Sequence, residues 1–230
     1  MMMTDVKMQA DNSTLELSVY DVVESDGWWY ESETSAKHFK AILDENPNVK
    51  QINIRINSVG GSVMEGIAIY NQLKAHKAHK TVFVDGFACS IASVIAMAGD
   101  TVVMPKVSMM MIHNPWTITQ GNAKELHKAA DDLDKIAEVS KQAYLAKAGD
   151  KLTEAELDAM LDAETYIPAA RCIELGLADC HELETPADDT AEQLAKMQAE
   201  AAEKAKQEAI RAEVQRRNTA VENALKKYSG

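Results

Sequence analysis

Residues 51–73 read QINIRINSVGGSVMEGIAIYNQL, and this stretch contains a strand pattern, a turn and a helix pattern in direct succession. Isoleucine alternates with polar residues in the first six positions, which is the period of a strand with one buried face. Residues 57–62 (NSVGGS) carry a glycine pair typical of a turn. Apolar residues from Val63 to Leu73 then recur at helical spacing. The stretch therefore predicts one strand–turn–helix unit.

The same succession returns further along the chain, as a short strand at Thr81–Val84, a small-residue turn at Gly86–Ser90 and an apolar helix at Ile91–Ala98. Other periodic stretches predict strands at Leu15–Val22, Thr101–Met104 and Ser108–Ile112, and helices at Ser35–Leu43, Asn122–Ala148, Leu152–Leu161 and Ala169–Leu175. Strand and helix patterns thus alternate without an internal repeat. This alternation is typical of the α/β class.

Composition and charge exclude several classes of protein. The 230 residues, 46% of them hydrophobic, suffice for one domain with a sizeable core plus an appendage. The net charge of −12 argues against nucleic acid as a partner. The most apolar stretch, Ile91–Ile112, is interrupted by Asp100, Pro105 and Lys106, so we expect no membrane span. Three cysteines without a regular spacing and an N-terminus without an apolar core segment favour a reducing, cytoplasmic location.

The composition changes near Pro186, which divides the chain into a body (1–185) and a tail (186–230). The tail has 8 acidic and 8 basic residues, so it is neutral and the body carries the whole negative charge. Alanine, glutamate, glutamine and lysine dominate the tail, and Thr190 with Gln193 resembles a capping box, which predicts one long helix. Its apolar stripe is thin. The tail is therefore either a solvated helix or a docking and assembly arm.

Ser90 lies where the second unit passes from strand to helix, between small residues. There its hydroxyl would lie at a helix N-terminus, where the helix dipole and the Ile91 N–H group stabilise negative charge. This is the arrangement of a nucleophile elbow, although the GxSxG pattern is absent. The alternative is that Ser90 only caps the helix. Similarly, the pair Gly60–Gly61 can offer backbone N–H groups to a developing anion, or can be a simple turn.

His113 ends an apolar strand and precedes Asn114 and Pro115. A histidine leaving a buried strand at a loop can act as a general base, although a structural role is the alternative. A serine hydroxyl becomes a strong nucleophile when a base removes its proton, and an acid orients that base. Asp162 and Glu164 are the candidate acids, and the residues alone do not decide between them.

Four runs, in this order, resemble the Clp protease proteolytic subunit, and they read INSVGGSVMEGIAIYNQL (56–73), GFACSIASVIAMAGD (86–100), MMMIHNP (109–115) and ETYIPAARCIELGLAD (164–179). The resemblance covers roughly Leu15 to Asp179 and is greatest to the viral branch, the prohead or head-maturation proteases. It implies a serine endopeptidase without a metal or cofactor. Proteins or peptides would be its substrates, with or without the assistance of an ATPase.

The resemblance also implies roles for individual residues. It makes Ser90 the nucleophile and His113 the base, and it assigns the oxyanion hole to Gly61 and Ile91. The third member of the triad, an aspartate in typical bacterial members, falls on Glu164. Because the extra methylene of glutamate changes its reach, Asp162 remains an alternative. A second departure is Val59, where the family has proline.

The implied fold is a spiral of ββα units with a long protruding helix, which would be Asn122–Ala148. The implied assembly is a homo-oligomer, with rings of seven as one form, in the cytoplasm of a bacterial host cell. Capsid or scaffold proteins would be partners of the tail, whereas nucleic acid and membrane would not be partners. Two other functions stay open: a catalytically silent assembly protein on the same fold, and a crotonase-like acyl-CoA enzyme, which shares the spiral and a two-amide oxyanion hole.

Overall fold

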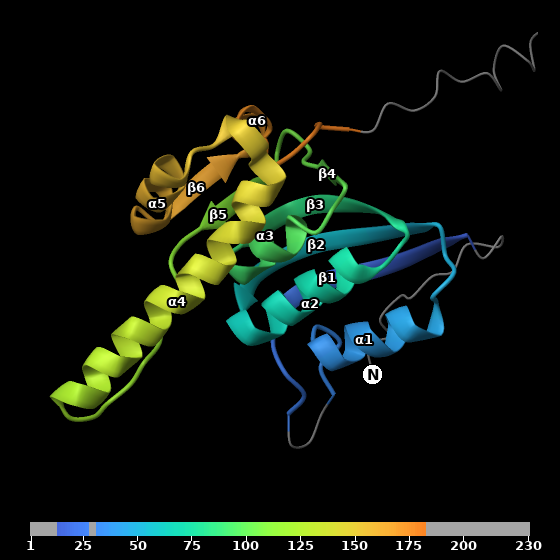
Figure 1. The fold of residues 1–230 in the computed structure, drawn as a ribbon. Coiled ribbons are helices and arrows are strands. Elements are labelled where there is room, and N and C mark those ends of the chain that lie inside the picture. Colours follow the sequence, from blue (N-terminus) through green and yellow to red (C-terminus); the bar gives the residue numbers. More distant parts are fainter. Residues whose placement is uncertain (1–12, 28–30, 183–230) are drawn as a thin grey trace, which may run out of the picture. The chain divides into compact units, whose positions relative to one another are not determined.

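The computed structural model describes residues 13–27 and 31–182 (Figure 1), and within them strands and helices alternate as predicted. The helical tail predicted for 186–230 lies outside the described residues. The strands are β1 Thr14–Val23, β2 Gln51–Gly61, β3 His79–Cys89, β4 Thr101–Val103, β5 Met109–Ile112 and β6 Thr165–Pro168. The helices are α1 Ala36–Glu45, α2 Val63–Ala75, α3 Ile91–Ala96, α4 Ala123–Ala148, the 3₁₀ turn η1 Gly149–Lys151, α5 Glu154–Asp162 and α6 Ala169–Glu174. The chain is thus a mixed α/β protein, as the sequence predicts.

One six-stranded sheet organises the described residues, in the order β1-β2-β3-β5-β6, with β4 also paired to β3. All pairs are parallel except β5 with β6. The first half of β3 pairs with β4, at Thr81–Phe83, and its end pairs with β5, at Phe87–Cys89. Because parallel strands end at the same edge of a sheet, β3 and β5 deliver the residues that follow them to one place.

The helices α1, α2 and α3 cover one face of the sheet (Figure 1), and the apolar core lies between. Ile52, Ile54 and Ile56 of β2 are fully buried on this face, which accounts for the isoleucine alternation in the sequence. Two of these helices begin at serine caps: the Ser35 and Ser62 side chains accept from backbone N–H groups in the first turn.

The other face of the sheet is largely polar at its centre. The Arg55 guanidinium donates to Asp85, and the Tyr20 hydroxyl also donates to Asp85, at 2.6 Å. The guanidinium lies over the Phe83 ring, 5.3 Å from its centroid. These contacts join the outward side chains of β1, β2 and β3 to one another.

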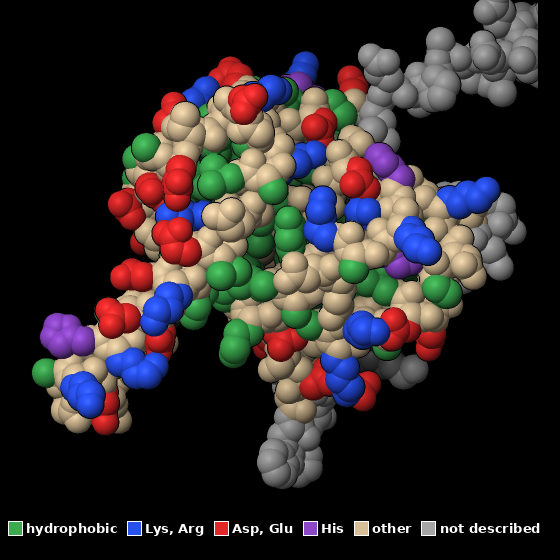
Figure 2. Space-filling view, viewed as in Figure 1, with side chains coloured by type: hydrophobic (Ala, Val, Ile, Leu, Met, Phe, Trp, Pro, Cys, Tyr) green, Lys and Arg blue, Asp and Glu red, His purple; other side chains and the backbone are tan. Residues whose placement is uncertain are grey.

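Helix α4 is the longest element, with 26 residues, and it begins at a capping box formed by Asn122 and Glu125. Its N-terminal half projects beyond the rest of the described chain (Figure 1), and charged side chains cover that half (Figure 2). Its C-terminal half buries Ala143, Tyr144 and Ala148. None of the helices in the described ranges is both long enough and apolar enough to cross a membrane.

The structure differs from the sequence-based prediction mainly at strand ends. Residues predicted as turns at 57–61 and 86–89 are the ends of β2 and β3. Gly60 and Gly61 pair with Val22 and Val23 of β1, and Phe87–Cys89 pairs with β5. Strand β6 was not predicted. It has only four residues and is formed by antiparallel pairing with β5.

Candidate active site

Ser90 forms the junction between β3 and α3 in an unusual backbone conformation. Its φ of 54° and ψ of −129° lie outside the regions that L-residues ordinarily occupy. The Ser90 N–H donates to the Met111 carbonyl at 2.8 Å, which anchors the turn to β5. Although Ser90 is the N-cap residue of α3, its side chain makes no capping hydrogen bond. The hydroxyl is therefore available for another partner.

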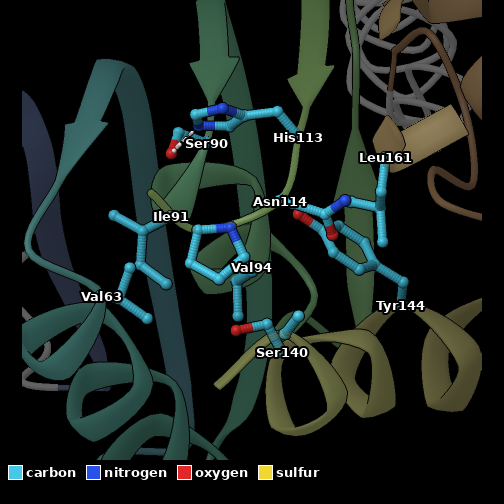
Figure 3. Close-up of a pocket in the computed structure, with 11 residues that line it drawn as sticks. Val63, Ser90, Ile91, Val94, His113, Asn114, Ser140, Tyr144 and Leu161 are labelled. Carbon is cyan, nitrogen blue, oxygen red and sulfur yellow. Dashed lines mark hydrogen bonds between the residues drawn. The ribbon is translucent and has the colours of Figure 1, made fainter. Parts of the chain in front are cut away.

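That partner is His113, which follows the last residue of β5. The His113 Nε2 atom lies 2.7 Å from the Ser90 Oγ atom (Figure 3). The two residues are 23 positions apart in the sequence, and the pairing of Cys89 with Met111 brings them together. Nε2 accepts the serine proton when the neutral ring carries its own proton on Nδ1. The pair thus has the geometry of a nucleophile with its general base.

The Cys89 thiol is the other candidate nucleophile beside this pair. Burial raises the pKa of the Cys89 thiol, so the reactive thiolate is scarce at neutral pH. Within the described ranges, no group of three or more His, Cys, Asp or Glu side chains is arranged to hold a metal ion. The hydroxyl of Ser90 is the best-placed reactive group.

The two candidate acids lie beside the end of α5. The Asp162 Oδ1 atom accepts from the Asn114 side-chain amide at 2.7 Å, so Asp162 contacts the neighbour of His113. Glu164 has an exposed side chain and a φ of 48°. The antiparallel register ends where Ile112 pairs with Thr165, so His113 directly follows the paired residues of β5 and Glu164 directly precedes those of β6. In the part of the chain that the structure describes, no carboxylate is hydrogen-bonded to His113.

Backbone amides of two segments lie close to Ser90. Gly60 has a φ of +94°, and a Cβ atom there would come within 2.7 Å of the Ser90 Cβ and 3.2 Å of the Ile91 nitrogen. This close approach and the positive φ require glycine. The peptide that joins Gly60 to Gly61 therefore runs next to the serine. Ile91 is the first residue of α3, so its N–H has no acceptor four residues earlier within the helix.

A pocket opens beside the Ser90–His113 pair (Figure 3). Ser140 and Asn114 supply polar groups at its wall, and the rest of the lining is mainly apolar. The apolar lining residues are Val63, Ile91, Val94, Pro115, Ala137, Tyr144 and Leu161. Its volume is about 20 Å³, roughly the space of one water molecule, so in this conformation the pocket is too small to hold an amino-acid side chain.

Three polar residues around the site were not predicted from the sequence: Asn114, Ser93 and Tyr144. Ser93 is the clearest case, because a hydroxyl within the predicted apolar helix must find a partner once it is buried. Its partners are the Tyr144 hydroxyl and the Ser90 carbonyl. The sequence carried this signal but did not identify the partner, which is 51 residues away.

Comparison with known proteins finds similarity to one family. The family model described as Clp protease matches residues 31–180. The chain is 32% identical over 140 residues to the ATP-dependent Clp protease proteolytic subunit of Ligilactobacillus salivarius (strain UCC118), an alignment that covers 60% of this chain and 70% of the relative. It is also 32% identical over 140 residues to the protein of the same name from Chlorella vulgaris, covering 60% of this chain and 68% of that relative.

Proposed function

The chain belongs to the Clp protease family, whose members are peptidases, and from this premise we propose that it is a serine endopeptidase with Ser90 as its nucleophile. The observation that carries the proposal is the 2.7 Å contact between the Ser90 Oγ and the His113 Nε2. A serine that only capped α3 would direct its oxygen to the helix instead.

In the proposed reaction, His113 removes the proton of Ser90 while the oxygen attacks the peptide carbonyl. The N–H groups of Gly61 and Ile91 stabilise the oxyanion of the tetrahedral intermediate. The protonated imidazole then gives its proton to the leaving amine, and an acyl-enzyme remains. Water then attacks the acyl-enzyme while His113 removes a proton from it. His113 returns that proton to Ser90 as the acyl group leaves.

For the third member of the triad we propose Glu164. Glu164 directly precedes Thr165, which pairs with the residue before His113, and this proximity supports the choice, whereas Asp162 already accepts a hydrogen bond from Asn114. Orientation of the ring by Glu164 would require a change of its side-chain rotamer, since the carboxylate makes no bond to His113 in this structure. Asp162 is the alternative acid.

We further propose a biological setting. Clp proteases form oligomeric rings and act on protein substrates. We assign this chain to the viral prohead or head-maturation branch, acting as a homo-oligomer, with seven-membered rings as one form, in the cytoplasm of a bacterial host cell. Glu164 in place of aspartate, Val59 in place of proline and the neutral tail 186–230 support the assignment. Capsid or scaffold proteins would be the partners and substrates.

A fluorophosphonate probe tests the proposed nucleophile. The probe should modify Ser90 of the full-length protein, and peptide mapping should locate the adduct. Ser90→Ala should abolish labelling and lower casein or peptide hydrolysis by at least about 10³-fold. Ser18→Ala, on the opposite face of the sheet, is the matched control and should react like the unmodified protein. Hydrolysis at a normal rate by the Ser90→Ala variant would contradict the proposal.

The second candidate function is a catalytically silent assembly protein. The absence of a carboxylate on His113 among the described residues favours it. The same probe discriminates the two, because an inactive fold would not be labelled at Ser90 even when it assembles normally.

A further inference from the structure

Three hydroxyl-bearing residues form a buried chain behind the proposed nucleophile. The Ser93 hydroxyl donates to the main-chain carbonyl of Ser90, and the Tyr144 hydroxyl lies 2.6 Å from the Ser93 Oγ. Ser93 is fully buried and Tyr144 is only 2% exposed, so water does not compete for these bonds. The chain connects the C-terminal part of α4 to the turn that carries the reactive serine.

The order of donors in this chain follows from the acceptor at its end. A carbonyl oxygen only accepts, so the single proton of the Ser93 hydroxyl is directed to the Ser90 carbonyl. The Tyr144 hydroxyl must then donate to Ser93. Burial raises the pKa of Tyr144 above its usual range near 10, although the bond to Ser93 acts in the opposite direction. The phenol therefore keeps the proton that it donates.

The chain ends on a peptide group under conformational strain. Ser90 has a φ of 54°, and such a conformation persists only where surrounding contacts enforce it. The Met111 carbonyl holds the amide on one side of Ser90, at 2.8 Å. On the other side, the Ser90 carbonyl accepts from both the N–H of Ser93, at 3.0 Å, and the Ser93 hydroxyl.

The peptide group fixed by Ser93 is the one that contains the Ile91 N–H. In a planar trans peptide, the carbonyl and the following N–H point in opposite directions. No peptide bond in the described residues is cis. Holding the Ser90 carbonyl therefore sets the direction of the Ile91 N–H. Hydrogen bonds accepted by the carbonyl also polarise the amide and strengthen its N–H as a donor.

We propose that Ser93 and Tyr144 are positioning residues that orient and polarise the Ile91 N–H for oxyanion stabilisation. The inference rests on the proposed peptidase function and adds two residues to it. In this role, the hydroxyl groups of Ser93 and Tyr144 do not contact the reacting atoms. Ser93 acts on the peptide group directly, and Tyr144 acts through Ser93.

The test compares Ser93→Ala, Tyr144→Phe and the double variant with the unmodified full-length protein. Ser93→Ala should lower kcat about 10- to 100-fold and Tyr144→Phe about 3- to 10-fold, below the loss that follows removal of a whole oxyanion donor. KM should change less than about 3-fold, because the loss arises in the transition state. The double variant should resemble Ser93→Ala, since Tyr144 acts through Ser93.

A transition-state analogue provides a readout that a merely structural role would not change. The inhibition constant of a peptide boronate should rise in proportion to the loss of kcat/KM, whereas affinity for the uncleaved peptide should stay constant. Tyr70→Phe removes a phenol hydroxyl from α2 and should leave all these constants unchanged. Tyr144→Phe keeps the aromatic ring, so it covers the case in which Ser93→Ala does not fold.

The outcomes separate the two proposals. If the unmodified protein is not labelled by the fluorophosphonate at Ser90, the peptidase proposal fails and the positioning role fails with it. If the unmodified protein is labelled and active, but both single variants keep its kcat and its boronate affinity, the positioning role alone is wrong. Additive losses in the double variant would also contradict the order Tyr144–Ser93–Ser90.

Discussion

At the scale of single residues, the conformation of Ser90 determines what its side chain can do. A positive φ costs a non-glycine residue roughly 1–3 kcal/mol. Hydrogen bonds on both sides of Ser90, to Met111 and from Ser93, hold this conformation in place. As a result the hydroxyl contacts His113 rather than the backbone of α3. The backbone conformation of Ser90 thus accounts both for the strain and for the availability of its hydroxyl.

The choice between the two candidate acids gives a prediction at this scale. Glu164→Gln should lower kcat about 10- to 100-fold, because an amide in that position does not stabilise the imidazolium. Asp162→Asn should stay within about 3-fold, since an asparagine oxygen can still accept from Asn114. Steady-state hydrolysis of one apolar peptide by both variants is the measurement. The reverse ranking would make Asp162 the orienting acid.

The sequence predicted the candidate site in part. Ser90 was recognisable because it lies in a turn between a predicted strand and a predicted helix, and His113 because it ends an apolar strand. The structure brings the two together through the pairing of β3 with β5. The Gly60–Gly61 pair was recognisable as a close backbone approach. Tyr144 was not, because a tyrosine at a buried helix position has the same pattern whether or not its hydroxyl has a function. Its role depends on a contact with Ser93 that no local pattern encodes.

At the scale of elements, the sequence predicted the strands in which apolar and polar side chains alternate. It did not predict strand residues that are defined only by hydrogen bonding to a neighbouring strand. The ends of β2 and β3 contain glycine and small residues, so their composition is that of a turn. Neighbouring strands nevertheless extend the ladder through them. Strand β6 is likewise defined by its partner β5 rather than by an alternating pattern.

An ion pair joins β3 to the residue directly before β4 and allows a prediction about stability. The Asp100 carboxylate accepts from the backbone N–H of Lys80, at 2.8 Å, and lies 3.0 Å from its buried ammonium group. Partial burial acts to raise the pKa of Asp100, but the bonds from Lys80 outweigh it and the pKa is lowered overall. Asp100→Asn should lower the free energy of unfolding at pH 7 by about 1 kcal/mol, a modest value because the carboxylate is 37% exposed.

The pH dependence of this loss has a defined sign. A carboxyl group with a lowered pKa in the folded state stabilises the protein above its unfolded pKa of about 3.9. That contribution is lost as the pH falls through the folded pKa. Denaturant unfolding should therefore show a gap between the two proteins at pH 7 that closes toward pH 3. Asp44→Asn, which removes an exposed pair with Lys40, is the control and should change stability little at either pH. A gap that is the same at both pH values would contradict the prediction.

At the scale of the whole molecule, the projecting half of α4 is a surface available to other chains. Leu126 is 44% exposed in this half, and Trp116 and Ile118 are exposed in the segment before it. Exposed large apolar side chains near a projecting element are typical of an interaction surface, here within a largely charged surround (Figure 2). We therefore expect copies of the chain to meet there in the proposed homo-oligomer.

The tail gives the prediction for assembly. Deletion of residues 186–230 should leave peptide hydrolysis within about 2-fold, because every proposed catalytic residue precedes Pro186. The same deletion should impair association with capsid or scaffold proteins, measured by co-sedimentation of the purified components. Association that is unchanged by the deletion would count against the tail as an assembly arm.

The position of the reactive groups within one polypeptide has a consequence for control. Ser90, His113 and the glycine pair all come from the same subunit, in contact without help from a neighbour. In the proposed peptidase, a lone subunit would thus already hold the nucleophile beside its base, with only the orienting carboxylate still to be brought to the ring. Control over which proteins are cleaved would then depend on access to Ser90, which enclosure of the active sites inside the proposed oligomer would restrict.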